Sequence, residues 1–335
     1  MIREIQSKIG FGPMSPEIIE AIIKASKMLG KAFMLISTQN QIDWNGGYVN
    51  KWDTKQYVEY VNKIRKKYPG NTVYLCRDHC GPGFKENSSI SDVYKTVADD
   101  IDNGFNLIHI DFSKISPNKD VVLEESIKII KYMFKKKSEM MIEIGTEENV
   151  GEIKDNIREI LKELNYIQKF VRPQFFVVQT GSLVKEMFQV GKFNESFVLR
   201  VHDLLSKNNV KLKEHNSDYL YFNQIKQRQD IVDAMNIAPQ LGVIQTLTVI
   251  NEALTYGIDI NPFLECSFKS GKWNKWLYFS NKENKMLCSI LAGHYNYISD
   301  EYKQLISNLE KYTDIKKIMI NRIIDLITYY SNAFN

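Results

Sequence analysis

The chain has 335 residues, of which 44% are hydrophobic and 25% are charged, as in an ordinary globular protein. Its 44 basic and 40 acidic residues leave a net charge of +4, which is too weak a field to indicate a nucleic-acid or lipid partner. No apolar stretch is long enough to cross a bilayer, and the first residues form no apolar signal segment. We therefore expect a cytoplasmic protein without a membrane partner.

Strand-like and helix-like runs alternate from the N-terminus to about residue 256, which is typical of a parallel sheet with crossover helices. We expect eight strands, near residues 8–12, 33–38, 72–78, 106–112, 139–145, 174–180, 210–215 and 233–238. The sequence predicts an α/β fold, a (β/α)8 TIM barrel over residues 1–257. Residues 258–335 are expected to form a C-terminal helical subdomain packed on the barrel.

Polar groups follow the expected strands at the point where each strand ends. Asp78 and His79 end the third strand, Glu143 lies on the fifth, and Glu214 and His215 end the seventh. Loops after the strands carry the chemistry of a TIM-barrel enzyme. These residues therefore mark the expected active face.

Histidine is scarce, with five residues in the chain, and three of them fall at or beside strand ends. His79 and His215 are flanked by polar and turn residues, which makes them candidate ligands of a divalent metal, together with Glu143 or Glu147. His109 lies between aliphatic neighbours, so a core or supporting role is equally open. A structural role is expected for His202 in an amphipathic helix, whereas the sequence leaves His294 undecided.

Asp78 directly precedes His79, so regular strand alternation would turn the two side chains in different directions. Asp78 can then face a substrate as a proton donor or acceptor, or it can simply cap the turn at Gly81 and Pro82. Two further loops, Asn45-Gly46-Gly47-Tyr48 and Thr180-Gly181-Ser182, could bind a phosphate through backbone N–H groups, or they are plain turns.

Six segments read in order resemble a known family. They are Asn40-Gln41-Ile42-Asp43-Trp44-Asn45-Gly46-Gly47-Tyr48, Asp78-His79-Cys80-Gly81-Pro82, His109-Ile110-Asp111-Phe112-Ser113, Ile144-Gly145-Thr146-Glu147, Val177-Val178-Gln179-Thr180-Gly181 and His215-Asn216-Ser217-Asp218-Tyr219. Together they resemble the tagatose-bisphosphate aldolase accessory-subunit family, which is labelled non-catalytic. That family is similar to the class II, zinc-dependent ketose-bisphosphate aldolases, which are (β/α)8 barrels.

The resemblance implies roles for individual residues. His79, Glu143 and His215 match metal-site positions of the aldolases, and Asp78 matches the aspartate that handles the proton at the cleaved bond. Glu147 matches the accessory family's own motif and is a second candidate for the proton step. The motifs also imply a set of substrate-binding residues: Asn40, Gln41, Gly46, Gly47, Gln179, Gly181, Ser182, Asn216, Asp218 and Asn236.

Two positions depart from the aldolase pattern. Gln179 and Ser182 lie where the aldolases have their middle zinc histidine, and an amide oxygen is a harder ligand than an imidazole. Zinc is the expected metal, with manganese or nickel as alternatives. Pro239 replaces an aldolase threonine that helps to hold phosphate, so a differently phosphorylated substrate is expected.

Three functions remain open from the sequence. The first is a metal-dependent aldolase that cleaves the C3–C4 bond of a ketose or ketose phosphate, or a C4 epimerase that uses the same retro-aldol step. The second is a silent accessory subunit that stabilises a class II aldolase partner, and the third is a sugar-binding protein without chemistry. A small sugar or sugar phosphate is the expected ligand, and a class II aldolase or a second copy of the chain is the expected protein partner.

Overall fold

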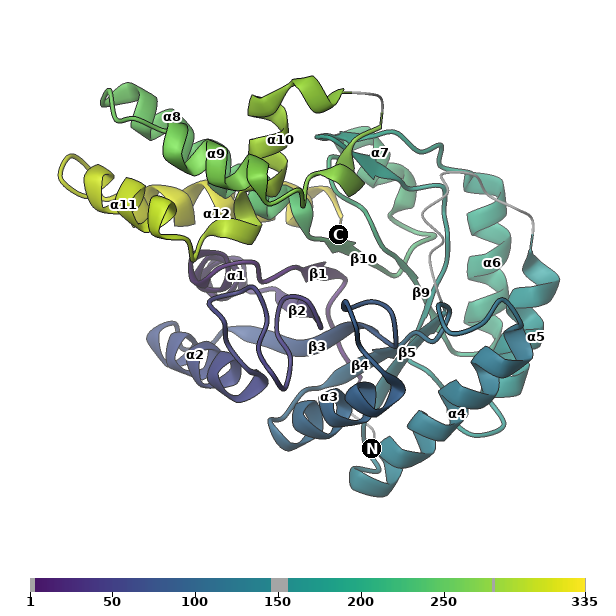
Figure 1. Ribbon diagram of the computed structural model, residues 1–335. Coiled ribbons are helices and arrows are strands. Elements are labelled where there is room, and N and C mark those ends of the chain that lie inside the picture. The colour runs from purple at the N-terminus through teal and green to yellow at the C-terminus, as the bar shows by residue number, and fades with distance from the viewer. Residues whose placement is uncertain (1–3, 146–155, 279–280, 335) are drawn as a thin grey trace.

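The computed structural model describes residues 4–145, 156–278 and 281–334. Eight parallel strands close into a barrel in the order β1-β10-β9-β6-β5-β4-β3-β2, with helices around it (Figure 1). The barrel strands are β1 (Ile9–Phe11), β2 (Ala32–Thr38), β3 (Thr72–Cys80), β4 (Leu107–Ile110), β5 (Met141–Gly145), β6 (Phe175–Val177), β9 (Lys211–Glu214) and β10 (Ala234–Ile237). The predicted (β/α)8 fold is confirmed, and each expected strand overlaps an observed one.

Local sequence signals set the helix starts. Ser15 caps α1 with Pro16 in its first turn, and Asp53 and Ser89 form capping boxes at α2 and α3. The helices of the barrel region are α1 (Pro16–Leu29), α2 (Thr54–Lys67), α3 (Ile90–Asp102), α4 (Lys119–Lys136), α5 (Ile157–Ile167), α6 (Glu195–Lys207), α7 (Phe222–Arg228) and α8 (Pro239–Thr255).

The barrel interior has an apolar lower layer and a polar upper layer. Side chains that alternate inward on the strands form the apolar layer: Ile5, Met34, Ile36, Cys76, Leu107, Phe175 and Ala234. Two residues further along three of these strands lie Asp78, His109 and Asn236, and Lys213 on β9 joins them in the polar layer. All four of these side chains are buried, so the polar layer lies directly under the C-terminal mouth of the barrel.

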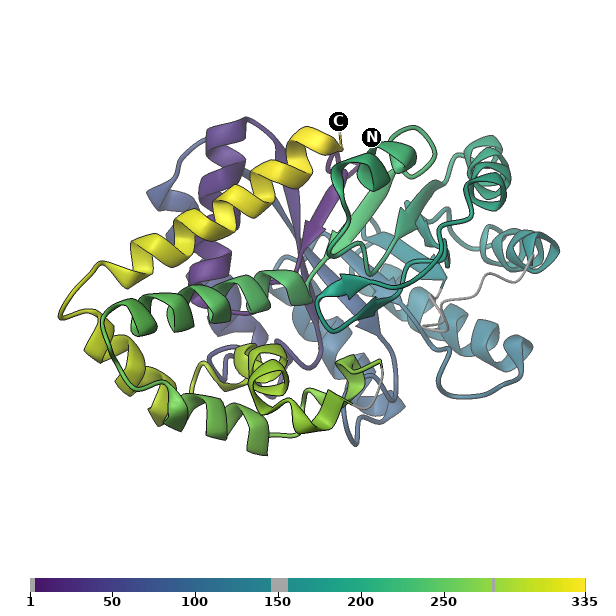
Figure 2. The same cartoon turned by 90° about the horizontal axis from the view of Figure 1, so that it is seen from above.

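The C-terminal helices are α9 (Asn261–Lys269), α10 (Lys285–Ala292), α11 (Asp300–Leu309) and α12 (Ile315–Ala333). α12 packs against α1 and α8, and Figure 2 shows it lying beside α1. Its buried face, including Ile320, Ile323 and Ile327, joins the main hydrophobic core, whereas α9 to α11 pack with α8 in a second cluster. The division of the chain at residue 257 stays a prediction.

A small antiparallel hairpin, β7 (Val184–Lys185) and β8 (Phe188–Gln189), follows β6 and was not expected from the sequence. The backbone N–H of Glu186 in its turn donates to the carbonyl of Trp276, at 2.6 Å. The hairpin therefore links the loop after β6 to the C-terminal segment. Among the residues described, no helix combines the length and the apolar character needed to span a membrane.

Candidate metal centre

Four strand ends bring three histidines and two carboxylates together under the barrel mouth. His79 and Asp78 come from β3, His109 from β4, Glu143 from β5, and His215 follows β9. One ligand atom from each of the three histidines lies within 4.8 Å of the others, and the same holds for the set of Asp78, His109, Glu143 and His215. The parallel barrel creates this cluster because it brings the C-terminal ends of neighbouring strands to one face.

His79 and His215 face each other, with His79 Nε2 3.3 Å from His215 Nδ1. The other nitrogen of each ring contacts a carboxylate: His79 Nδ1 lies 2.9 Å from Asp111 Oδ2, and His215 Nε2 lies 2.9 Å from Glu143 Oε1. A carboxylate only accepts hydrogen bonds when ionised, so each contact fixes the ring hydrogen on that side. The two facing nitrogens then both carry lone pairs, which is the arrangement of a pair of metal ligands.

His109 is held in the same way. Its Nε2–H donates to the carbonyl of Gly145 at 2.8 Å, so its Nδ1 faces the cluster. That Nδ1 lies 3.5 Å from Asp78 Oδ1 and 3.7 Å from Glu143 Oε1, and it accepts a long hydrogen bond of 3.3 Å from the His79 backbone N–H. Burial alone would lower the pKa of His109, but the hydrogen bond with Asp78 and the charges of Glu143 and Asp111 outweigh it and raise the pKa to about 9. A metal ion bound at Nδ1 would therefore replace a proton there.

Glu143 lies between a cation and an imidazole. Its Oε2 accepts from Lys213 Nζ at 2.5 Å while its Oε1 contacts His215. Burial alone would raise the pKa of Glu143, but the charge of Lys213 and the hydrogen bond with His215 outweigh it and lower the pKa to about 2. Burial also lowers the pKa of His215, which keeps this imidazole neutral and able to bind a metal.

Asp78 and His79 both reach the cluster, which corrects the expectation that they would turn in different directions. His79 adopts a left-handed backbone conformation with φ of 44°, and the pairing of β3 with β4 shifts between Arg77 and Cys80. This irregularity breaks the strand alternation. Asp78 Oδ1 lies 3.7 Å from His215 Nε2. Burial alone would raise the pKa of Asp78, but its interactions with His215, His79 and His109 outweigh burial and hold the pKa well below its usual value.

The loop after β2 carries four of the expected substrate residues. The Gln41 side chain is buried and accepts the Thr38 N–H at 2.7 Å, whereas Asn40 is exposed and donates to the Phe84 carbonyl at 2.6 Å. A Cβ at Gly47 would lie 2.1 Å from the Gln41 carbonyl, so glycine is needed there for close packing. Gly46 accepts from Lys85 Nζ at 3.1 Å through its own carbonyl. These contacts give the two glycines a role in loop structure.

The loop after β6 carries three of the expected substrate residues, Gln179, Gly181 and Ser182. Gln179 Oε1 accepts the Gly181 N–H at 2.8 Å, and Gly181 has φ of 99°, as the turn requires. Ser182 donates to Glu214 and accepts from Arg228. Glu214 and Arg228 form a buried ion pair on the outer side of β9. The third imidazole of the cluster comes from His109 on β4.

The remaining expected residues lie near β9 and β10. Asn216, with φ of 54°, forms the turn after β9, and Asp218 accepts hydrogen bonds from the start of α8. The Asn236 amide is 3% exposed, and neither its oxygen nor its nitrogen has a hydrogen-bond partner among the residues described. Glu147 lies outside the described residues.

His294, which the sequence left undecided, lies on the β1 and β10 side of the mouth. The ring of His294 is 6.0 Å from that of Tyr48. A Cβ added at Gly242 would lie 2.7 Å from the His294 Cβ, so His294 packs closely against α8. Burial lowers the pKa of His294 to about 3, so the imidazole is neutral. It does not belong to the histidine cluster.

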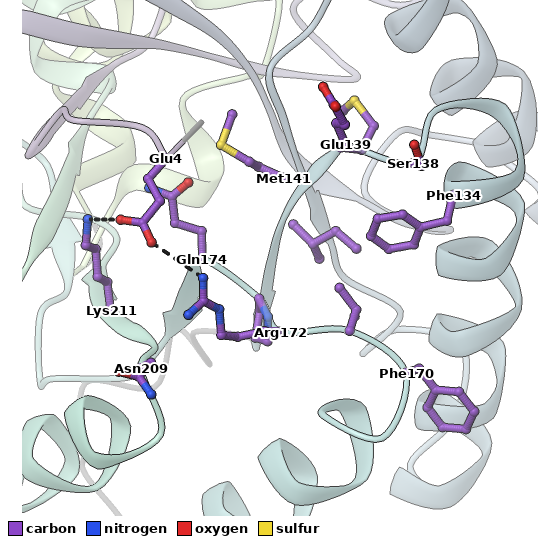
Figure 3. Close-up of a pocket in the computed structure, with 14 residues that line it drawn as sticks. Glu4, Phe134, Ser138, Glu139, Met141, Phe170, Arg172, Gln174, Asn209 and Lys211 are labelled. Carbon is purple, nitrogen blue, oxygen red and sulfur yellow. Dashed lines mark ion pairs between the residues drawn. The ribbon is translucent and has the colours of Figure 1, made fainter. Parts of the chain in front are cut away.

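A surface pocket of about 210 Å³ lies at the opposite end of the barrel, next to the first residues of β5, β6 and β9. Figure 3 shows Glu4 between Arg172 and Lys211, and both ion pairs measure 3.5 Å. The charges of Glu4, Arg172 and Lys211 are thus paired with one another. TIM barrels place their chemistry at the C-terminal face, so we assign the site to the histidine cluster and not to this pocket.

Comparison with solved structures supports the fold. A probable tagatose 6 phosphate kinase from Sinorhizobium meliloti 1021 aligns with a TM-score of 0.83 at 14% identity, over 98% of this chain and 100% of that chain. A fructose-bisphosphate aldolase from Campylobacter jejuni aligns with a TM-score of 0.59 at 14% identity, over 97% of this chain and 90% of that chain. The YdjI aldolase from Escherichia coli K12 gives a TM-score of 0.51 at 14% identity, with 93% of each chain covered.

No curated protein matches the sequence. Residues 10–133 match the family model described as D-tagatose-1,6-bisphosphate aldolase subunit GatZ/KbaZ-like. This segment contains the motifs at residues 40–48, 78–82 and 109–113, on which the resemblance was first based. The resemblance is therefore confirmed over residues 10–133, and the whole chain shares its (β/α)8 fold with the solved structures named above.

Proposed function

We propose that the protein is a metal-dependent carbon–carbon lyase of the class II aldolase type, which cleaves the C3–C4 bond of a ketose or ketose phosphate. The observation that carries the proposal is the 3.3 Å separation of His79 Nε2 and His215 Nδ1, with the other nitrogen of each ring on a carboxylate. Two nitrogens bound to one zinc ion at about 2.0–2.1 Å in tetrahedral geometry are about 3.3–3.4 Å apart. The spacing fits a shared metal ion.

His79, His109 and His215 would hold the ion, and Asp111, Gly145 and Glu143 would orient them. This set differs from the expected one, because His109 becomes a ligand and Glu143 becomes the group that fixes the tautomer of His215. Three imidazoles with a fourth position left open are typical of catalytic zinc, whereas manganese prefers oxygen ligands. The bound ion would polarise the ketose carbonyl and stabilise the charge left on the substrate when the C3–C4 bond breaks.

Asp78 would carry the proton. Its low pKa keeps it ionised, so it can accept the hydrogen of the C4 hydroxyl as that carbon becomes an aldehyde. The electron pair of the broken bond stays on C3, which then takes a proton from water to give the second, triose-sized fragment, while Asp78 releases its proton to solvent. In the reverse direction, Asp78 would return the proton to the newly formed hydroxyl.

A catalytically silent subunit is the second candidate, because the matched family is described as an aldolase subunit. In that case the protein would bind a tagatose-bisphosphate aldolase chain and stabilise it. The three convergent imidazoles favour the enzyme, since a purely structural subunit does not need lone pairs directed at one point.

The test combines metal analysis with a substrate panel. The protein alone is loaded with zinc, its metal content is measured, and it is incubated with ketohexoses and their mono- and bisphosphates while triose products are trapped in a coupled reducing assay. We expect about one zinc per chain and trapped triose with at least one ketose. A C4-inverted sugar without triose would identify an epimerase instead.

A matched control variant is available in His202→Ala, since His202 lies on α6 and contacts only Asp233 among the ion pairs described. This variant should keep both metal and activity. A zinc-loaded wild type that is inactive on the whole panel, and that co-purifies with a class II aldolase, would overturn the proposal in favour of the silent subunit.

A further inference from the structure

The N-terminus of α8 points toward the mouth of the barrel, after the eighth barrel strand. TIM-barrel enzymes that act on phosphorylated substrates frequently bind phosphate here, at loops after the seventh and eighth strands and at a helix N-terminus. Free backbone N–H groups and the helix dipole make such a site. Any group that already accepts hydrogen bonds from these N–H groups therefore affects which substrate can bind.

In this chain, a carboxylate already occupies the start of α8. Asp218 Oδ1 accepts the backbone N–H of Ala238 at 3.0 Å and that of Gln240 at 2.9 Å. Pro239 lies between them and has no N–H to offer. A substrate phosphate would have to displace Asp218 from both N–H groups. Burial raises the pKa of Asp218 to about 7, and above that pH its carboxylate also repels a second anion.

The neighbouring groups fit a hydroxyl. Asp218 Oδ2 is buried and has no hydrogen-bond partner among the residues described, and the same holds for both amide atoms of Asn236. The two residues lie on adjacent strand ends, where the Ser217 N–H donates to the Asn236 carbonyl at 3.0 Å. Gly10 makes room for the Asn236 side chain, since a Cβ at Gly10 would lie 2.4 Å from Asn236 Oδ1. A carboxylate and an amide together accept and donate hydrogen bonds, as a sugar hydroxyl requires.

We propose that the α8 end of the site receives an unphosphorylated, hydroxyl-bearing end of the ketose, and that Asp218 is the residue that excludes phosphate from it. This inference rests on the proposed function, because it takes the barrel mouth to be a ketose site. It follows that the substrate carries at most one phosphate, at its other end.

The test measures binding to the zinc-loaded full-length protein by calorimetry, with D-tagatose 1-phosphate, 6-phosphate and 1,6-bisphosphate and with inorganic phosphate as probes. The wild type should bind the bisphosphate no more than about threefold tighter than the better monophosphate. Asp218→Gly frees two N–H groups and removes one negative charge, so it should raise the affinity for the bisphosphate and for inorganic phosphate about tenfold or more.

Asp53→Gly is the matched control, because it removes another helix-capping aspartate, at α2, where Asp53 accepts the Gln56 N–H at 2.8 Å. It should gain no affinity for phosphate. If Asp218→Gly does not fold, Asp218→Asn keeps an oxygen for the two N–H groups but loses the charge, and a gain of about threefold is expected.

The outcomes separate this inference from the proposed function. A wild type that binds the bisphosphate tenfold or more tighter than either monophosphate would overturn the inference, and cleavage of that bisphosphate would leave the lyase proposal standing. Gained phosphate affinity in Asp218→Gly, in a protein that cleaves no ketose, would support the phosphate exclusion and overturn the lyase.

Discussion

His79 Nε2 and His215 Nδ1 lie 3.3 Å apart at the barrel mouth, and in the neutral rings neither nitrogen carries a hydrogen, because Asp111 and Glu143 accept the hydrogen on the other side of each ring. Two lone pairs in such proximity repel each other, and a cation between them removes the repulsion. The fold thus holds two lone pairs in an unfavourable arrangement. A metal ion would bind more tightly here because it relieves their repulsion.

Zinc should stabilise the protein against unfolding. A ligand that binds only the folded state at 100 times its Kd adds about 2.7 kcal/mol of stability, so we expect a clear rise in Tm on zinc addition and a fall on chelation. His79→Ala, His109→Ala and His215→Ala should each abolish most of this rise, whereas His202→Ala should keep it. If His109→Ala shows the same rise in Tm with zinc as the wild type, Glu143 and not His109 is the third ligand.

Asp78→Asn should separate metal binding from turnover. The amide keeps the shape of the carboxylate but cannot accept a proton, so turnover should fall by roughly 10²-fold or more. The zinc content should stay close to that of the wild type, because the three imidazoles are unchanged. Wild-type turnover in this variant would show that Asp78 only shapes the turn after β3, and Glu147 would then be the candidate for the proton step.

Lys213→Met should be strongly destabilising, since it leaves Glu143 buried without its cation. Lys213 is 1% exposed and its Nζ lies 2.5 Å from Glu143 Oε2. Breaking a buried ion pair from one side costs about 3–5 kcal/mol, which urea unfolding can measure. The double variant Lys213→Met/Glu143→Gln removes both charges and should be more stable than Lys213→Met alone. Additive effects of the two substitutions, within about 0.5 kcal/mol, would contradict the coupling.

The sequence was sufficient to predict the barrel, because eight short apolar runs alternate with amphipathic helices and polar residues follow the strand ends. It also predicted that His79, Glu143 and His215 would meet, since parallel strands end at one face. The part played by His109 was not decided by the sequence. Its aliphatic neighbours fit a core residue equally well, and only the register of β4 against β3 and β5 shows that it points into the cluster.

Two further features depend on contacts between distant segments. The left-handed conformation of His79 has no clear local signal, because a positive φ is uncommon for any residue other than glycine and no glycine marks the position. The role of Asp218 at α8 requires knowing that the loop after β9 reaches the start of that helix, twenty residues later in the chain. Ser182 was assigned to the substrate from its motif, but its hydroxyl is directed to Glu214 behind the barrel wall.

Glu20 joins the C-terminal helix α12 to the barrel, and its contribution to stability should depend on pH. Its side chain on α1 is 2% exposed, and it accepts from Lys67 Nζ at 2.5 Å and from the Tyr68 hydroxyl at 2.8 Å while Lys316 Nζ on α12 lies 3.3 Å away. Burial alone would raise the pKa of Glu20, but the hydrogen bonds from Lys67 and Tyr68 and the charge of Lys316 outweigh it. The pKa is therefore lowered from the ordinary value of 4.5.

A carboxyl group with a lowered folded-state pKa stabilises the protein above its unfolded-state pKa, and this contribution is lost as the pH falls through the folded-state value. Glu20→Gln should therefore lower the free energy of unfolding by about 1–3 kcal/mol at pH 7, with the difference from the wild type shrinking as the pH falls below 4.5. Urea unfolding at a series of pH values measures this difference, with the exposed Glu59→Gln on α2 as the control that should change little. A difference that stays constant from pH 7 down to the acid unfolding transition would show that Glu20 acts through its shape and not through its charge.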